Sequence, residues 1–276
     1  MDKIWKLAHG QSIKLDNKSI IMGILNLTPD SFSDGGMIKS LDQTIEAAIQ
    51  MKNDGALIID VGGESTRPNA TKISAEEEQK RILPVIKQLS EMGFIISVDT
   101  YHAQTAQAAL KAGAHIINDI EGLQLEEEMA KIIADYNAGV VIMHTNRERK
   151  YELDIIEDQK VFFKKSIEIA NKANISKSSI VLDPGFGFGK DFNMNIGLLA
   201  RAGELKKIGY PLLVGTSRKR FVGALSGDKE PMERDYATAA TSVILRMAGA
   251  SIFRVHNIGV NKDALAVADE VCNYNG

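Results

Sequence analysis

The feature that most constrains the fold is an alternation of apolar runs with amphipathic segments, which repeats eight times along the chain. The runs are typical of β-strands, and each is followed by apolar residues at helical spacing. Most runs are continuously apolar, which favours parallel strands that are buried on both faces. The predicted strands cover residues 20–27, 56–61, 94–98, 114–117, 140–143, 180–182, 211–214 and 252–255.

Eight strand–helix units within 276 residues are typical of an α/β fold of the (β/α)8 TIM barrel type, in which helices cover a ring of parallel strands. A doubly wound open sheet is the alternative. No proline-, glycine- or serine-rich linker divides the chain, so we expect one domain over residues 1–276. Residues 4–21 are expected to form a short N-terminal β-hairpin that plugs one end of the barrel. Helices are predicted over 40–53, 74–92, 102–112, 125–136, 156–173, 194–208, 234–248 and 261–274, with a further helical segment from about 218.

The composition narrows the classes of function. The formal net charge of −3 offers no electrostatic case for nucleic-acid binding. The single cysteine, Cys272, permits no intrachain disulfide, which fits a reducing compartment. No apolar run approaches the about 20 residues that a membrane-spanning helix needs, and residues 1–16 lack the apolar core of a signal peptide. We therefore expect a soluble, cytoplasmic protein.

Polar side chains stand at the carboxyl ends of the predicted strands, where a TIM barrel places its chemistry. Asp183 is the clearest case, because it ends an apolar run and is followed at once by proline and three alternating glycines. Taken singly, each position has an ordinary explanation, such as a helix cap for Asn118 or a buried core histidine for His144. Their occurrence at the ends of all eight strands favours a shared site. The positions are Asn26, Asp60, Asp99, Asn118, His144, Asp183, the segment 216–219, and Arg254 with His256.

The kinds of side chain at these positions favour a planar, polar ligand. Carboxylates beside an amide can accept parallel N–H bonds from the edge of a guanidine-like heterocycle. Lys219 and Arg254 suit carbonyl or phosphate oxygens. The residue order does not fit a Ser-His-Asp triad, and no pair of histidines has the spacing of zinc ligands. The loop 185–190 matches neither a P-loop nor a dinucleotide fingerprint.

Two segments rich in glycine and turn residues follow the first two strands, at 26–36 and 62–70. They contain almost no residues that a core would bury, so we interpret them as covers over the strand ends. Ordinary solvated turns are the alternative. Phe32 is the exception in the first segment, and it favours a cover that stacks on a ligand.

Seven segments, in order and spread over nearly the whole chain, closely resemble the dihydropteroate synthases, a family of pterin-binding enzymes. They are residues 22–36, 60–68, 97–100, 117–120, 183–190, 215–219 and 254–256, and the first two are highly specific. The resemblance implies a transferase of folate biosynthesis. Such an enzyme condenses 6-hydroxymethyl-7,8-dihydropterin diphosphate with p-aminobenzoate to give 7,8-dihydropteroate and diphosphate. The resemblance also implies Mg²⁺, a homodimer, and sulfonamides as mimics of p-aminobenzoate.

The resemblance further implies a role for each matching residue. The residues implied in catalysis are Asp34, which would stabilise the methylene cation left when diphosphate departs, and Asn26, Lys219 and Arg254. The pterin would meet Asp99, Asn118, Asp183, Lys219, Arg254, Met143, Ile24 and Asp60. The diphosphate would meet Asn26, which would also bind Mg²⁺, together with Arg67, Arg254 and His256. p-Aminobenzoate would be framed by Phe32, Thr66, Pro68, Phe188, Lys219 and Arg220.

The sequence departs from the family pattern at three places. Asn69 stands where glycine is usual, the segment 145–149 lacks the usual glycine and proline, and Arg220 stands where many relatives have a serine. Two other functions remain as alternatives: a folate-dependent methyltransferase on the same barrel, which would need neither diphosphate nor Mg²⁺, and a non-catalytic pterin-binding paralogue. The cover segments speak against both.

Overall fold

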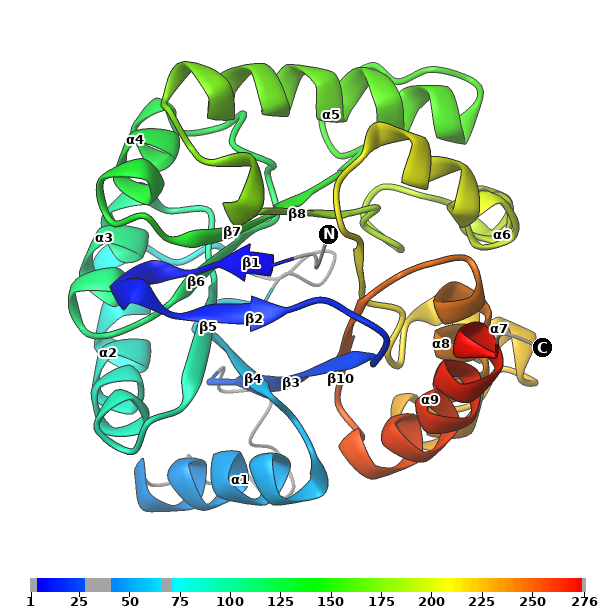
Figure 1. Ribbon diagram of the computed structural model, residues 1–276, viewed down its shortest axis with the longest axis horizontal. Coiled ribbons are helices and arrows are strands. Elements are labelled where there is room, and N and C mark those ends of the chain that lie inside the picture. The colour runs from blue at the N-terminus through cyan, green and yellow to red at the C-terminus, as the bar shows by residue number, and fades with distance from the viewer. Residues whose placement is uncertain (1–3, 28–40, 66–70, 275–276) are drawn as a thin grey trace.

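The computed structural model describes residues 4–27, 41–65 and 71–274. Its strands form one ring of parallel strands that is surrounded by helices, as Figure 1 shows. The predicted cover residues Phe32, Asp34, Thr66, Arg67 and Pro68 lie outside the described residues, as does Asn69. No helix among the described residues combines the length and the apolar character that crossing a membrane requires.

The strands pair in the order β8-β7-β6-β5-β4-β3-β10-β9, and each neighbouring pair is parallel. A bridge between Leu182 and Leu212 joins the two ends of this order, with a hydrogen bond of 3.0 Å from Leu182 N to Pro211 O. The ring is therefore closed, which confirms the TIM barrel and rules out the open sheet. The strands are β3 Ile20–Asn26, β4 Ile58–Gly62, β5 Ile95–Asp99, β6 Ile116–Asp119, β7 Gly139–Met143, β8 Ile180–Asp183, β9 Leu213–Val214 and β10 Ile252–Val255.

The helices alternate with these strands and follow the predicted positions. Side-chain caps set several of their starts: the Ser74 hydroxyl accepts from Glu77 N, and the Asn257 side chain accepts from Val260 N. The helix predicted over 194–208 is instead split into α6 and a 3-10 segment over Ala202–Ile208, because Gly203 weakens the helix there. The α-helices are α1 Leu41–Asp54, α2 Ala75–Glu91, α3 Ala103–Lys111, α4 Glu127–Asp135, α5 Ile155–Lys172, α6 Phe192–Arg201, α7 Arg220–Leu225, α8 Asp235–Met247 and α9 Ile258–Asn273.

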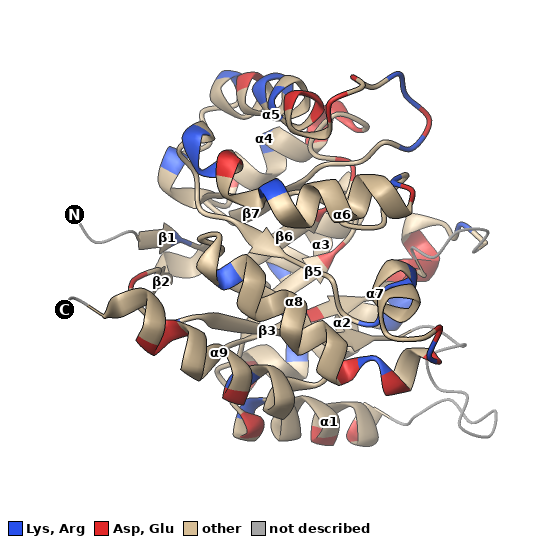
Figure 2. Cartoon of the chain, turned by 90° about the vertical axis from the view of Figure 1, so that its right-hand side faces the viewer, with Lys and Arg blue, Asp and Glu red and all other residues tan. Residues whose placement is uncertain are grey.

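The predicted hairpin consists of β1 Ile4–Lys6 and β2 Ser12–Lys14, which pair antiparallel. Trp5 is 1% exposed and donates from Nε1 to Ser179 O at 2.9 Å, just before β8 begins. The apolar side chains of the hairpin join the lower interior of the barrel in one buried cluster. The hairpin therefore closes the end of the barrel at which the strands begin, opposite α7 (Figure 2).

The interior of the barrel is built in layers, because alternate residues of each strand point inward. The lower layer is apolar and packs against the hairpin; it contains Met22, Ile58, Ile116, Val141, Val181, Leu213 and Ile252. Two residues further along each strand, the inward positions become largely polar. They are Ile24, Asp60, Asn118, Met143, Asp183, Gly215 and Arg254, with Ser97 and Asp99 from β5. The chain thus places an apolar floor beneath a polar layer at the strand ends.

Candidate functional site

Four polar side chains from four strands meet in the upper layer. The Arg254 guanidinium on β10 donates from Nε to Asp60 Oδ2 at 2.6 Å and from Nη2 to Asp99 Oδ2 at 2.7 Å. Asn118 on β6 donates from Nδ2 to the same Asp60 oxygen at 3.3 Å. One arginine therefore joins strands that lie on both sides of β3, and it lies deep in the mouth of the barrel.

Three oxygen atoms of this cluster are buried and have no hydrogen-bond partner among the described residues. They are Asp60 Oδ1, Asp99 Oδ1 and Asn118 Oδ1. A buried acceptor without a donor costs about 1–3 kcal/mol, more when it is charged. Three such acceptors beside one another are therefore suited to a ligand that brings several N–H donors.

Burial dominates the electrostatics of the cluster. The loss of water, opposed by the Arg254 charge and reinforced by the nearby Asp60 carboxylate, raises the pKa of Asp99 to about 7. Arg254 itself has a raised pKa: its burial works against the charge, but Asp60 and Asp99 more than compensate. The arginine therefore keeps its charge, whereas burial favours the protonated form of Asp99.

Asp183 ends β8 and turns the strand into the glycine-rich loop. Its Oδ1 accepts from Gly185 N at 2.8 Å, and burial raises the pKa of its carboxyl even though Lys219 and this N–H stabilise the ionised form. Gly185 is required here, because its φ is +63° and a Cβ would stand 1.9 Å from His144 O. The loop therefore passes directly over the end of β7.

Lys219 stands beside Asp183 at the start of α7. Its Nζ donates to Phe186 O and lies 4.8 Å from the centre of the Phe188 ring. The loss of solvent around the ammonium lowers the pKa of Lys219 to about 8, although Asp183 opposes the shift. Phe188 is half-buried and Arg220 is exposed. A lysine, an aromatic ring and a carboxylate thus lie side by side at the strand ends.

The remaining pocket residues lie at the same end of the barrel. Ile24 and Asp60 pair in register between β3 and β4, and Met143 pairs with Asp183 between β7 and β8. His256 follows β10, and its Nδ1 lies 2.9 Å from Ser217 Oγ. These positions place the apolar residues next to the carboxylates and the histidine next to the loop after β9.

Asn26 is the residue at this end that could hold a metal. It lies at the carboxyl end of β3, where Gly62 leaves a small space: a Cβ on Gly62 would be 3.4 Å from Asn26 Oδ1 and 3.6 Å from Asp99 Cβ. No group of three or more His, Cys, Asp or Glu side chains suited to a metal occurs in the described part of the chain. A single amide oxygen fits a Mg²⁺ ion whose other ligands are phosphate oxygens and water.

His144 differs from the expectation that all strand-end residues share one mouth. It comes one residue after the inward-facing Met143, so its ring points outward, where it is fully buried. His144 Nε2 lies 2.8 Å from Asp158 Oδ2, and burial lowers the pKa of the imidazole to about 3. The ordinary explanation, a core histidine, holds. Thr216 and Arg218 also face away, toward Thr241 and Asp235.

Sequence reasoning gave no individual role to two residues that the structure places near the site, Ser97 and Lys190, whereas Ser217 belongs to the predicted strand-end segment 216–219. Ser97 lies on β5 two residues before Asp99, faces inward, and has a buried hydroxyl without a partner among the described residues. Ser217 holds His256, and Lys190 lies behind the glycine loop. The sequence indicates the position of Ser97 alone, because a residue two places before Asp99 on a strand points to the same face.

Comparisons with known proteins show the family to which the chain belongs. The family model described as pterin binding enzyme matches residues 22–256. Dihydropteroate synthase of Bacillus subtilis is 42% identical over 266 residues, which are 96% of this chain and 93% of the relative.

Two solved structures are also similar. Dihydropteroate synthase of Clostridium difficile, determined in the presence of pteroic acid, is 47% identical with a TM-score of 0.89, covering 92% of this chain and 97% of that one. The enzyme of Xanthomonas albilineans with 4-aminobenzoic acid is 36% identical with a TM-score of 0.93, and the match covers 100% of each chain. The chain belongs to the pterin-binding enzyme family and, within it, to the dihydropteroate synthases.

Proposed function

We propose that the chain condenses 6-hydroxymethyl-7,8-dihydropterin diphosphate with p-aminobenzoate, and that the strand-end cluster binds the pterin ring. The observation that supports this most strongly is the set of buried, unpartnered oxygens on Asp60, Asp99 and Asn118 beside the carboxylate of Asp183. A pterin presents its amino group and ring N–H groups along flat edges, and carboxylates accept such donors in parallel. Family membership supports the reaction, and this match of ligand donors with buried acceptors supports the assignment of the site.

In this proposal each group at the mouth has a distinct task. Asp183 accepts from the 2-amino and N3 edge of the pterin, and Asp99 and Asn118 bind the other ring nitrogens, of which N8 carries the hydrogen in a 7,8-dihydropterin. Lys219 donates to the ring carbonyl and N5, and Arg254 lies against the ring face. Met143, Ile24 and Asp60 shape the floor and walls of the pocket.

In the chemical step the leaving group departs before the weak nucleophile attacks. The electron-rich dihydropterin stabilises a cation at its exocyclic methylene, so the C–O bond to diphosphate breaks before the arylamine attacks. The chain then has to bind the charge that leaves and to position the amine. We assign the diphosphate to Asn26, Arg67, Arg254 and His256, and the stabilisation of the methylene cation to Asp34. Bound through Asn26, Mg²⁺ would neutralise part of the diphosphate charge.

The second substrate is assigned to the outer part of the mouth. Phe188 and Lys219 lie beside each other there, with the exposed Arg220 one residue further on. Together with Phe32, Thr66 and Pro68 they would frame p-aminobenzoate. An arginine at position 220 suits the carboxylate of this substrate, because its guanidinium can donate two parallel hydrogen bonds.

A diphosphate-release assay tests the proposed reaction. With the dihydropterin diphosphate and Mg²⁺ present, we expect diphosphate and 7,8-dihydropteroate to form in equal amounts when p-aminobenzoate is added. Asp34→Asn should lower turnover far more than it lowers affinity for the pterin substrate; equal turnover would remove Asp34 from the mechanism. A methyltransferase or a non-catalytic paralogue would release no diphosphate under any of these conditions.

We also propose a homodimer that forms through α8. The inner face of helix α8 packs on the barrel, whereas an outer stripe is exposed and consists of Tyr236, Ala240, Ile244 and Met247. The exposed fraction is 79% for Tyr236 and 59% for Met247. Large apolar side chains exposed along one stripe are typical of an interaction surface. Light scattering should give twice the 30.1 kDa chain mass, and Met247→Asp should shift the protein toward the monomer. A monomeric wild type would contradict this assignment.

A further inference from the structure

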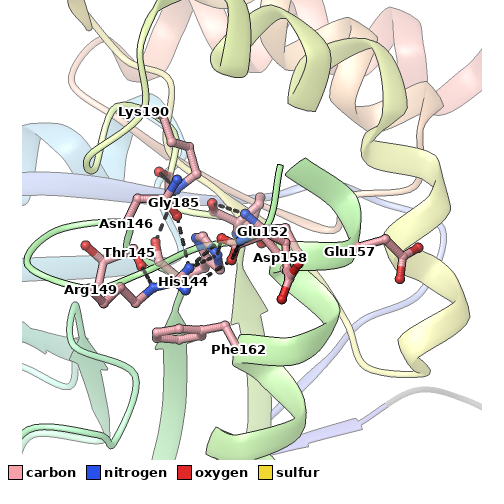
Figure 3. Close-up of polar contacts among 12 residues, drawn as sticks. His144, Thr145, Asn146, Arg149, Glu152, Glu157, Asp158, Phe162, Gly185 and Lys190 are labelled. Atoms are coloured by element: carbon pink, nitrogen blue, oxygen red, sulfur yellow. Dashed lines mark hydrogen bonds and ion pairs between the residues drawn. The ribbon is translucent and has the colours of Figure 1, made fainter. Parts of the chain in front are cut away.

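The glycine loop that follows β8 is clasped between two lysines, of which only Lys219 faces the mouth. The other, Lys190, is 8% exposed and ends the loop on its far side. Figure 3 shows its side chain reaching down to Gly185, next to the cluster around His144. Because Lys190 has no part in the reaction derived above, its burial requires another explanation.

The ammonium of Lys190 is held by backbone carbonyls instead of carboxylates. Its Nζ donates to Gly185 O at 2.8 Å, to Phe188 O at 3.3 Å and to His144 O at 3.5 Å. None of the ion pairs among the described residues includes Lys190. Burying a charge in this way is costly, and burial together with the charge of Lys219 lowers the pKa of Lys190 well below its usual value.

These contacts determine the direction in which each peptide group of the loop points. The carbonyls of Gly185 and Phe188 point back to Lys190, whereas the carbonyl between them, that of Phe186, points forward to Lys219. Phe188 N also donates to Gly185 O at 3.2 Å, which closes a turn. The three glycines of the loop have φ values of +63°, +79° and +65°. Because glycine is conformationally free, the backbone needs these hydrogen bonds from the two lysines to keep one conformation.

Lys190 fastens this turn to a rigid support. His144 O is one of its acceptors, and Asn146 N donates to Phe188 O at 3.2 Å. The same segment is held from below, because Arg149 donates to Thr145 O at 2.5 Å and to both oxygens of Asp158. In Figure 3, Arg149 lies over Phe162 with His144 between it and Lys190.

We propose that Lys190 is a positioning residue that presents Phe188 and the Phe186 carbonyl to Lys219 and thereby shapes the binding site for the arylamine substrate. This inference rests on the proposed function. Asp183 does not depend on Lys190 to the same degree, since it belongs to β8 and is held by strand pairing, including His144 N to Asp183 O at 2.8 Å. Loss of the Lys190 ammonium should therefore disturb the second substrate and spare the first.

The test compares Michaelis constants for the two substrates in Lys190→Met, which keeps an unbranched apolar side chain of similar size and removes the charge. We expect the KM for p-aminobenzoate to rise about tenfold or more, because a misplaced contact surface costs binding of that order. The KM for the pterin diphosphate should stay within about threefold of wild type, because its carboxylate partner is on a strand. Lys190→Arg, which restores a charged donor, should recover part of the loss.

Arg149→Met is the matched control. It removes the other cation of the cluster, which contacts none of the loop carbonyls at 185–188 and holds only the supporting segment, so it should lower the melting temperature and change the ratio of the two KM values less than Lys190→Met does. If Lys190→Met does not fold, Lys190→Gln provides the comparison, since it keeps a shorter neutral donor, and it should also raise the KM for p-aminobenzoate selectively. Unchanged values, or an equal rise in both constants, would overturn the inference. Failure of the proposed function is distinct: wild type would then release no diphosphate at all.

Discussion

Asp99 combines one carboxyl oxygen held 2.7 Å from Arg254 with a second, buried oxygen that has no partner among the described residues. Burial keeps its pKa near 7, so in the empty site the group titrates near physiological pH. A ligand that donates to the unpartnered oxygen stabilises the ionised form and lowers this pKa. Binding of a pterin should therefore be linked to the release of a proton.

The linkage has a definite sign and range. Because the raised pKa means that the empty protein holds a proton that the complex releases, affinity should increase as pH rises toward about 7 and level off above it. Calorimetry of 6-hydroxymethyl-7,8-dihydropterin binding, in buffers of different ionisation enthalpy, measures the released protons at about pH 6 and about pH 8.5. We expect release at the lower pH alone and none from Asp99→Asn; equal release at both values would refute the assignment.

We expect Asp183 to contribute to pterin binding and not to the stability of the fold. Burial raises the pKa of its carboxyl, so the ionised group is held at a cost in the absence of ligand. Asp183→Asn should leave the melting temperature unchanged or raised, and should weaken pterin binding at least about tenfold, since a charge-assisted hydrogen bond contributes about 1.5–3 kcal/mol. Thermal unfolding and calorimetry on the same samples check both parts. A large fall in melting temperature with intact affinity would make Asp183 a structural residue.

At the scale of the elements, the close packing of the glycine loop on β7 contributes to the stability of the fold. At Gly185 a Cβ would meet His144 O at 1.9 Å, whereas at Gly93 (φ +72°) it would meet nothing within 4 Å. Gly185→Ala should therefore destabilise the fold by about 3 kcal/mol or more, from overpacking added to a left-handed backbone. Gly93→Ala, the control, carries only the backbone penalty of about 1–2 kcal/mol. Urea unfolding gives both values, and equal costs would show that the close packing of the loop on β7 is not important.

At this scale the sequence predicts elements better than orientations. The continuous apolar runs indicated the strands, and the caps and glycines indicated most helix ends. Successive side chains along a strand point to opposite faces, so a shift of one residue decides whether a strand-end residue faces the mouth. Met143 faces inward and His144 outward for this reason, although the uncertain end of the strand allowed both. The contacts of Lys190 could not be predicted from the sequence, because its partners are backbone carbonyls and their directions depend on the folded loop.

For the whole molecule, the hairpin and the mouth occupy opposite ends of one closed barrel. The hairpin fills the lower interior with Trp5 and its apolar neighbours, so it covers the polar layer from the end at which the strands begin. The family resemblance identified the reaction, and the fold explains how residues far apart in the sequence converge at one end of the barrel. Asp60, Asn118 and Arg254 meet because equivalent positions on a parallel ring share one height.

The central claim is that this upper layer binds a dihydropterin by its edge, and a crystal structure with bound 6-hydroxymethyl-7,8-dihydropterin tests it most directly. The account predicts the amino and N3 edge within about 3 Å of the Asp183 carboxylate. It also predicts that Asp99 Oδ1 and Asn118 Oδ1 each gain a ligand donor. A pterin bound elsewhere, or one in this mouth that leaves those oxygens without partners, would contradict it.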